Sequence, residues 1–159
     1  MMNNFETNVS HLLEVQALDY FHQGYNCAQS VFAAGAHHCG LSEEQALLIS
    51  APFGAGFGRM REICGALSGL SMAIGCHHGN TTPDRTEKEK IFQLTRDVAE
   101  QFKSEFGSIY CRDLLDLNEE SRNNESALPG ERTEAYYANR PCERCVAYCA
   151  KLLATYIPQ

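Results

Sequence analysis

The chain has 159 residues, enough for one domain with its own core, and its 44% hydrophobic content excludes an intrinsically disordered protein. With a net charge of −7 and only 13 basic residues, we expect no nucleic-acid partner. The first residues lack the basic start and apolar run of a secretory signal, and the most apolar stretch, residues 63–76, is shorter than the roughly 20 residues of a membrane span. We therefore expect a single domain over residues 1–159, cytoplasmic and without a membrane span.

Apolar residues recur at helical spacing along the chain, and no segment alternates as a strand does, so we predict an all-α protein. The first helix is predicted to begin at Asn8 or Ser10 and to break at Gly24. Its inward face is predicted to consist of five apolar residues: Leu12, Leu13, Val15, Leu18 and Phe21.

Two further helices are predicted before residue 53. One carries Cys27 and is expected to end near His38, with Gly40 as its stop signal. The other begins at the capping box of residues 42–45 and ends before Pro52. A short turn at Gly40 therefore separates the two.

A glycine-rich loop over residues 53–59 leads into a helix predicted over residues 62–77. The faces of this helix are almost all small or apolar, so we expect it to lie at the centre of the fold. Gly65 and Gly69 have the spacing that lets two helices pack closely.

The second half of the chain is predicted to hold two more long helices. One has Pro83 in its first turn and ends at Gly107. The other opens at Pro141, and its inward residues are Val146, Leu152, Leu153 and Tyr156. Between them, residues 118–139 are polar and aperiodic, which predicts a long mobile loop. The whole is expected to be an irregular bundle of about six helices around the central Gly/Ala-rich helix.

Cysteine is the outlying feature of the composition, with eight residues at positions 27, 39, 64, 76, 111, 142, 145 and 149. In a reducing compartment such a count indicates redox or metal chemistry rather than a disulfide framework. Cys64 is the most informative, because it is predicted two residues into the central helix, where unpaired amides and the helix dipole stabilise a thiolate. Arg59 and Arg61 lie just upstream and add positive charge.

Cys142 and Cys145 form a CxxC at a helix start, and Cys149 follows one turn later on the same face. Such a pair is typical of redox or metal sites, but no second CxxC is present, which disfavours a zinc ribbon. Cys145 and Cys149 are equally compatible with positions in the core. The histidine pairs 37–38 and 77–78 are expected at helix ends, and a metal role is the minor alternative.

Four landmarks stand in a characteristic order: Cys27 after Gly-Tyr-Asn; Gly-Phe-Gly-Arg before Cys64-Gly-Ala-Leu-Ser-Gly; Cys111 after Phe-Gly-Ser-Ile-Tyr; and Cys142 four residues before Val146. This order resembles the C-GCAxxG-C-C family of redox-active proteins, and the resemblance runs from about Tyr20 to Leu153. It implies a prokaryotic protein, often encoded beside transporters, whose functional cysteines are Cys27, Cys64, Cys111 and Cys142. It also implies that Cys39, Cys76, Cys145 and Cys149 are additions of this sequence.

Three functions are compatible with this pattern. The first is thiol–disulfide or electron-transfer chemistry with an unidentified redox partner, in which Cys64 is the nucleophile and a resolving thiol comes from Cys27, Cys111 or Cys142. The second is a zinc or iron–sulfur site built from these four cysteines, with Cys145 as a further candidate ligand. The third is a non-catalytic accessory module of a transporter. The first two require Cys27, Cys64, Cys111 and one of Cys142 or Cys145 to lie together. Because residues 118–139 are attached between Cys111 and Cys142, we expect them near the mouth of this cluster.

Overall fold

The computed structural model describes residues 4–157, with side chains from residue 8 onward, and these residues are helical apart from loops and one isolated β-bridge. This confirms the all-α prediction. Six helices have eight residues or more: α1 (Asn4–His22), α2 (Cys27–Ala34), α3 (Glu43–Ser50), α5 (Gly65–His78), α6 (Arg85–Phe106) and α10 (Cys142–Leu153). The shorter elements are η1 (Ala36–Cys39), η2 (Ala51–Phe53), α4 (Gly54–Phe57), α7 (Cys111–Leu114), α8 (Glu119–Asn123) and α9 (Glu134–Ala138).

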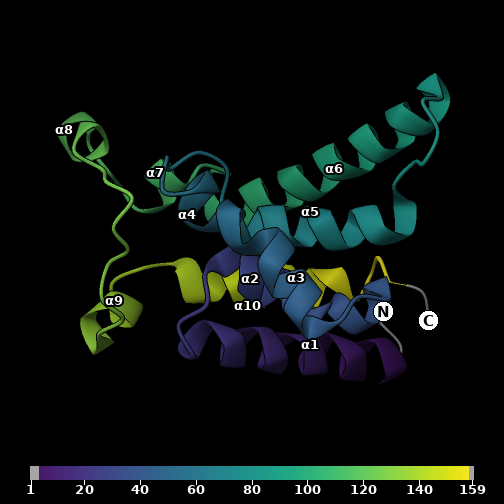
Figure 1. Cartoon of the computed structure of the whole chain (residues 1–159), viewed down its shortest axis with the longest axis horizontal. Coiled ribbons are helices and arrows are strands. Elements are labelled where there is room, and N and C mark those ends of the chain that lie inside the picture. Colours follow the sequence, from purple (N-terminus) through teal and green to yellow (C-terminus); the bar gives the residue numbers. More distant parts are fainter. Residues whose placement is uncertain (1–3, 158–159) are drawn as a thin grey trace.

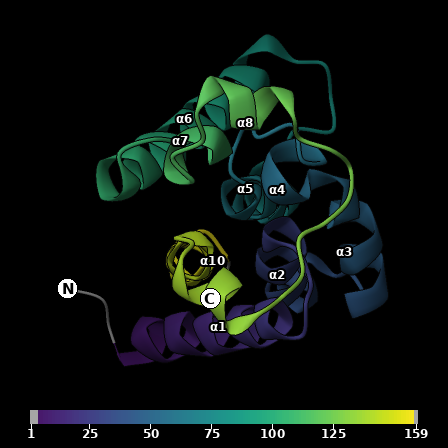
Figure 2. The same ribbon diagram turned by 90° about the vertical axis from the view of Figure 1, so that its left-hand side faces the viewer.

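Helices α1, α2, α5 and α10 form the body of the bundle (Figures 1 and 2). Figure 2 shows α5 and α10 nearly end-on, with α1 across the bottom and α2 beside them. Helix α5 packs against α2, α10, α6 and α4, which is the central place predicted for it. The largest fully buried side chains belong to Phe21, Phe102, Leu13, Leu70, Ile74 and Leu153.

The glycines of α5 decide how closely it approaches α2. A Cβ atom placed on Gly69 would lie 2.6 Å from the carbonyl oxygen of Ala28 and 3.2 Å from its Cα. No side chain fits in that space, so the small-residue spacing predicted to allow close packing does so here between two helices of one bundle.

The first helix differs from its prediction in both start and orientation. It begins at Asn4 rather than at Asn8 or Ser10. Leu12 and Val15 are 55% and 49% exposed, so they do not belong to the inward face. The buried positions follow helical spacing and include Leu13 and Phe21 of the predicted stripe, because that face meets α2 and α10: Ser10, Leu13, Ala17 and Phe21.

The predictions for the second and third helices differ in accuracy. Helix α2 ends at Ala34 rather than near His38, and the tight turn η1 carries the chain on to Gly40. Gly40 has a φ of 67°, the left-handed conformation expected of a stop signal. The capping box of α3 is present as predicted, because Ser42 accepts from the amide of Gln45 and Gln45 accepts from the amide of Ser42.

Helix α5 begins at Gly65, three residues later than predicted. Arg59 and Arg61 have φ values of 70° and 62°, which α-helical residues do not adopt, and Cys64 is extended with φ −51° and ψ 129°. Cys64 is therefore the N-cap of α5 and not a residue within it. Pro83 similarly lies outside its helix, because the N-cap of α6 is Asp84.

Residues 118–139, which we call the strap, are not aperiodic throughout. Asn118 and Thr133 each accept a hydrogen bond from an amide three residues on, and these caps start α8 and α9. The strap joins α7 to α10 and runs across the end of the bundle (Figure 2). At the C-terminal end, Tyr156 follows α10 rather than belonging to it, and within residues 4–157 no helix is long and apolar enough to cross a membrane.

Candidate cysteine site

The four cysteines singled out by the family resemblance all stand where a helix begins. Cys27, Cys111 and Cys142 are the first residues of α2, α7 and α10, and Cys64 is the N-cap of α5. A capping box explains the start of α2, since Asn26 accepts from the amide of Gln29. Unpaired amides and the helix dipole favour negative charge at such positions, while burial and the neighbouring groups decide whether the pKa of each thiol falls or rises.

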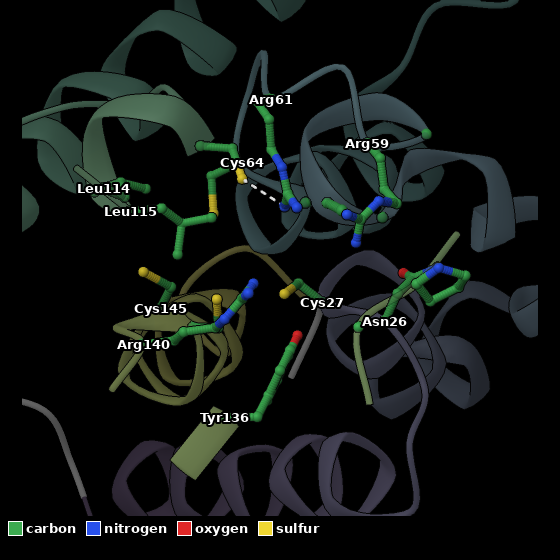
Figure 3. A pocket seen from close by; sticks show the side chains of 18 of the residues that line it. Asn26, Cys27, Arg59, Arg61, Cys64, Leu114, Leu115, Tyr136, Arg140 and Cys145 are labelled. Carbon is green, nitrogen blue, oxygen red and sulfur yellow. Dashed lines mark hydrogen bonds between the residues drawn. The ribbon is translucent and has the colours of Figure 1, made fainter. Parts of the chain in front are cut away.

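One cavity of about 390 Å³ brings these residues together. It is lined by five cysteines: Cys27, Cys64, Cys111, Cys142 and Cys145. Figure 3 shows Cys27, Cys64 and Cys145 around the same space. The residues predicted to cluster therefore do so, although they come from separate helices. The strap forms part of the wall through Ala127, Pro129, Gly130, Arg132 and Tyr136, which is the location predicted for it.

A short backbone bridge holds Cys64 beside Cys111. The amide of Cys64 donates to the carbonyl of Ile109 at 2.8 Å, and the amide of Cys111 donates to the carbonyl of Glu62 at 2.7 Å. These bonds fix the N-terminus of α5 against that of α7. Burial raises the pKa of Cys111 to about 11, although the nearby guanidinium of Arg61, whose Nη1 lies 3.8 Å from Sγ, opposes the rise.

Cys64 and Cys145 form the first thiol pair of the cavity. Hydrogen bonding with the Cys145 thiol is the main cause that lowers the pKa of Cys64. Burial opposes the effect, while the amides of Leu67 and Ala66 at the start of α5 add to it. The same hydrogen bond, with burial, raises the pKa of Cys145. Cys64 is thus the thiolate-favouring member and Cys145 the protonated one, and both are buried.

Cys27 and Cys142 form the second pair in the same way. Hydrogen bonding with the Cys27 thiol is the main cause that lowers the pKa of Cys142 to about 7, against the effect of burial. The positive charges of Arg140, Arg132 and Arg61 lower it further. The pKa of Cys27 is correspondingly raised, by the bond to Cys142 and by burial. Cys142 is also only half-buried, which makes it the more accessible of the two thiolate-favouring cysteines.

Three cysteines lie outside the cavity. Cys149 is in the core with no exposed surface. Cys39, in η1, and Cys76, near the end of α5, share a hydrogen bond, and burial together with that bond raises the pKa of Cys39 to about 12. The histidine pairs 37–38 and 77–78 stand at the ends of η1 and α5, as predicted, and do not line the cavity.

Arginine is the second feature of the site. Arg59, Arg61, Arg132 and Arg140 all line the cavity. Arg61 is only 3% exposed, and its Nε lies 2.9 Å from Oε1 of Glu125, whose other oxygen accepts from Arg59 at 2.8 Å. Burial would raise the pKa of Glu125, but the hydrogen bond and charge of Arg61, with the charge of Arg59, hold it below its ordinary value. Glu125 thereby ties the strap to the glycine-rich loop.

Sequence reasoning named Cys145 as a candidate metal ligand but not as the partner of Cys64, and it missed several charged residues of the site. Cys145 is the hydrogen-bond partner of Cys64, whereas the resemblance made it an addition of this sequence; its CxxC spacing was the available signal. Arg132, Arg140 and Glu125 had no such signal, since charged residues in a polar segment ordinarily face solvent.

The arrangement of the sulfurs bears on the metal alternative. Among the residues that the structure describes, no group of three or more His, Cys, Asp or Glu side chains is placed to hold a metal ion. The five cavity thiols instead form two hydrogen-bonded pairs and one thiol beside Arg61. The described side chains therefore do not present the tetrahedral thiolate cage of a zinc or iron–sulfur site.

Comparison with known proteins adds one match. A family model described as "Putative redox-active protein (C_GCAxxG_C_C)" matches residues 25–156, a span that includes all five cysteines of the cavity. No curated protein and no solved structure matches the chain.

Proposed function

The chain belongs to the C_GCAxxG_C_C family of redox-active proteins, and we propose that it is a thiol–disulfide oxidoreductase that works through two cysteine pairs. One observation carries the proposal: a single cavity is lined by Cys27, Cys142, Cys64 and Cys145. It is supported by the opposite pKa shifts within the Cys27–Cys142 and Cys64–Cys145 pairs, where the pKa of one thiol is lowered and that of its partner raised. A nucleophilic thiolate beside a protonated resolving thiol is the arrangement that disulfide exchange requires.

Cys142 is the attacking thiol in this proposal. Its thiolate attacks one sulfur of a substrate disulfide, forms a mixed disulfide and releases one substrate thiolate. Cys27 then loses its proton, which neutralises the released thiolate, and attacks the Cys142 sulfur. The second substrate thiolate leaves and takes up a proton from solvent. Two electrons and two protons pass from the Cys27–Cys142 dithiol to the substrate, which departs as two thiols.

Cys64 and Cys145 supply the second dithiol. Cys64 is 6% exposed, so an incoming disulfide reaches it less readily than it reaches Cys142. Exchange with the newly formed Cys27–Cys142 disulfide would move the bond to Cys64–Cys145 and restore the outer pair, again as a two-electron step. An external thiol reductant returns the protein to its starting state. Cys111 takes no part in this sequence, and association with a transporter stays a prediction.

Disulfide mapping tests the proposal. The anaerobically purified, reduced protein is treated with one and then two equivalents of a disulfide oxidant and digested without reductant. We expect peptides linked through Cys27–Cys142 first and Cys64–Cys145 second. A Cys142–Cys145 bond, the local CxxC pairing, would overturn the assignment of pairs. A protein that forms no cavity disulfide and retains stoichiometric metal would overturn the function itself.

The matched variants are Cys145→Ser and Cys39→Ser. Cys145→Ser should lose the second link while keeping the first. Cys39→Ser, which changes a thiol outside the cavity, should leave both links unchanged.

A further inference from the structure

We infer that the substrate of this site is a small organic disulfide that carries negatively charged groups, which Arg140 and Arg132 bind. The inference rests on the proposed function and deepens it by naming the substrate class. It starts from the charges around the cavity, which thiol chemistry alone does not require.

The cavity has an excess of positive charge. Four guanidinium groups line it, and among the described residues no aspartate or glutamate does. The one carboxylate that reaches these arginines from outside the lining, Glu125, is paired with Arg59 and Arg61. The chain as a whole has a net charge of −7, so this positive cavity stands out against an acidic protein and would concentrate anions.

Arg140 is the arginine most available to a ligand. Within residues 4–157 it has no carboxylate at ion-pair distance, and its guanidinium lies 4.4 Å from the centre of the Tyr136 ring. Figure 3 shows Arg140 and Tyr136 beside Cys27 and Cys145 at the cavity. Stacking on a ring orients a guanidinium while leaving its N–H edge unpaired, and that edge matches a carboxylate in a bidentate way.

Arg132 provides a second, more rigid positive charge. Its guanidinium lies 4.6 Å from the centre of the same Tyr136 ring and donates to the carbonyl of Tyr25 at 2.9 Å. A neutral carbonyl group accepts a hydrogen bond from the guanidinium without cancelling its positive charge. Both arginines also lower the pKa of Cys142, so they are close enough to act on a molecule whose sulfur approaches that thiolate.

The size of the cavity points to a small molecule. A volume of about 390 Å³ lies near the lower end of the range for small-molecule sites. The strap and the start of α10 form its wall on the side of Arg140. A compact disulfide with charged groups at its ends would place a sulfur at Cys142 and an anionic group at Arg140.

The test uses three disulfides of similar length and different charge: dithiodipropionate, which is doubly negative, hydroxyethyl disulfide, which is neutral, and cystamine, which is doubly positive. Each disulfide is mixed with the reduced protein, and the rate of the first thiol release is measured. To correct for the reactivity of the disulfide itself, this rate is divided by the rate at which the same disulfide reacts with free mercaptoethanol. We expect the corrected rate to be about tenfold higher for the anionic than for the neutral compound, and lowest for cystamine. Equal corrected rates would overturn the inference.

Arg140→Gln should reduce the ratio of the anionic to the neutral rate toward one. The ratio is the informative quantity, because the variant also changes the thiolate fraction of Cys142, which affects both rates alike. Arg144→Gln is the matched control: Arg144 lies in α10, four residues after Arg140, its side chain is 73% exposed, and it does not line the cavity. A drop in the ratio in both variants would mean that general charge, and not the cavity arginine, is responsible.

Suberate tests anion binding separately from the proposed function. It has the length and charge of dithiodipropionate, but methylenes replace the sulfurs, so it cannot take part in disulfide exchange. It should slow iodoacetamide labelling of Cys142 in the wild-type protein and much less in Arg140→Gln. Protection by suberate without reduction of any disulfide would retain the anion site and reject the oxidoreductase. Disulfide reduction without charge preference or suberate protection would reject the anion site alone.

Discussion

Gly65 of α5 lies directly against Cys27 of α2, and a Cβ atom on Gly65 would stand 3.2 Å from the Cβ of Cys27. One turn further along α5, Gly69 meets the backbone of Ala28 even more closely. These two contacts let the N-termini of α2 and α5 converge, and the N-terminus of α5 is where Cys64 stands. The glycines of the CGAxxG motif therefore position the cysteines through packing.

Substitution of Gly69 tests this packing. Gly69→Ala should lower the free energy of unfolding by about 2 kcal/mol, because the new methyl group would lie 2.6 Å from the Ala28 carbonyl oxygen. Gly75→Ala, in the same helix but with no neighbouring atom within 4 Å, should raise it by up to about 1 kcal/mol through helix propensity. Urea unfolding of the reduced proteins measures both. Equal effects of the two substitutions would mean that α2 and α5 can separate without cost.

The rate of Cys142 alkylation should follow its pKa. In the reduced protein, labelling of Cys142 by limiting iodoacetamide should increase with pH around a midpoint of about 7, because only the thiolate reacts. Arg140→Gln should move the midpoint to higher pH, since a positive charge that favours the thiolate is lost. Mass spectrometry of quenched samples gives the rates, and Cys39, with a pKa of about 12, should stay unlabelled across the same range. Labelling of Cys64 ahead of Cys142 would support the nucleophile predicted from sequence.

The strap should be the first segment that a protease cuts, and Glu125 should control how fast. Glu125→Gln removes the carboxylate shared by Arg59 and Arg61, and we expect cleavage within residues 118–139 to accelerate several-fold, as about 1–3 kcal/mol of local stability is lost. Glu120→Gln, an exposed change in α8, should leave the rate unchanged. Because the pKa of Glu125 is lowered, the tether is complete above about pH 4.3 and is lost as the pH falls through the lowered value. Cleavage first at the termini of α6 would contradict this account.

Local sequence signals correctly predicted the helix ends that depend on residues nearby in the sequence. The capping box at Ser42 and the stop at Gly107 were found because each acts through the adjoining backbone. The sequence did not predict that Leu12 faces outward while Leu13 faces inward, because this depends on where α10 packs against α1. For the same reason Arg140, polar and in a polar segment, gave no sign that it would face a cavity.

The candidate site, too, was predicted from the sequence only in part. Four of its cysteines were found through the family resemblance, and their common place at helix starts gives a physical reason for the pattern. The pairing of Cys64 with Cys145 and of Cys27 with Cys142 was beyond sequence reasoning. A CxxC suggests a bond between its own two members, whereas α10 packs against both α2 and α5, which gives each cysteine a partner on another helix.

The buried thiol of Cys149 should make the protein lose stability in alkali. Burial raises its pKa well above the ordinary value, so the folded protein keeps this proton while the unfolded chain releases it above about pH 8.5. Stability present below that pH should therefore decline by up to about 1.4 kcal/mol per further pH unit for this thiol. Cys149→Ala should cost about 1 kcal/mol at neutral pH by leaving a small void, yet this deficit should vanish at about pH 9 and be reversed at about pH 10. Urea unfolding under reducing conditions at these pH values measures the crossover, and Cys76→Ala, an exposed change, is the control. Parallel losses for wild type and Cys149→Ala would show that other buried groups, and not this thiol, govern the alkaline limit.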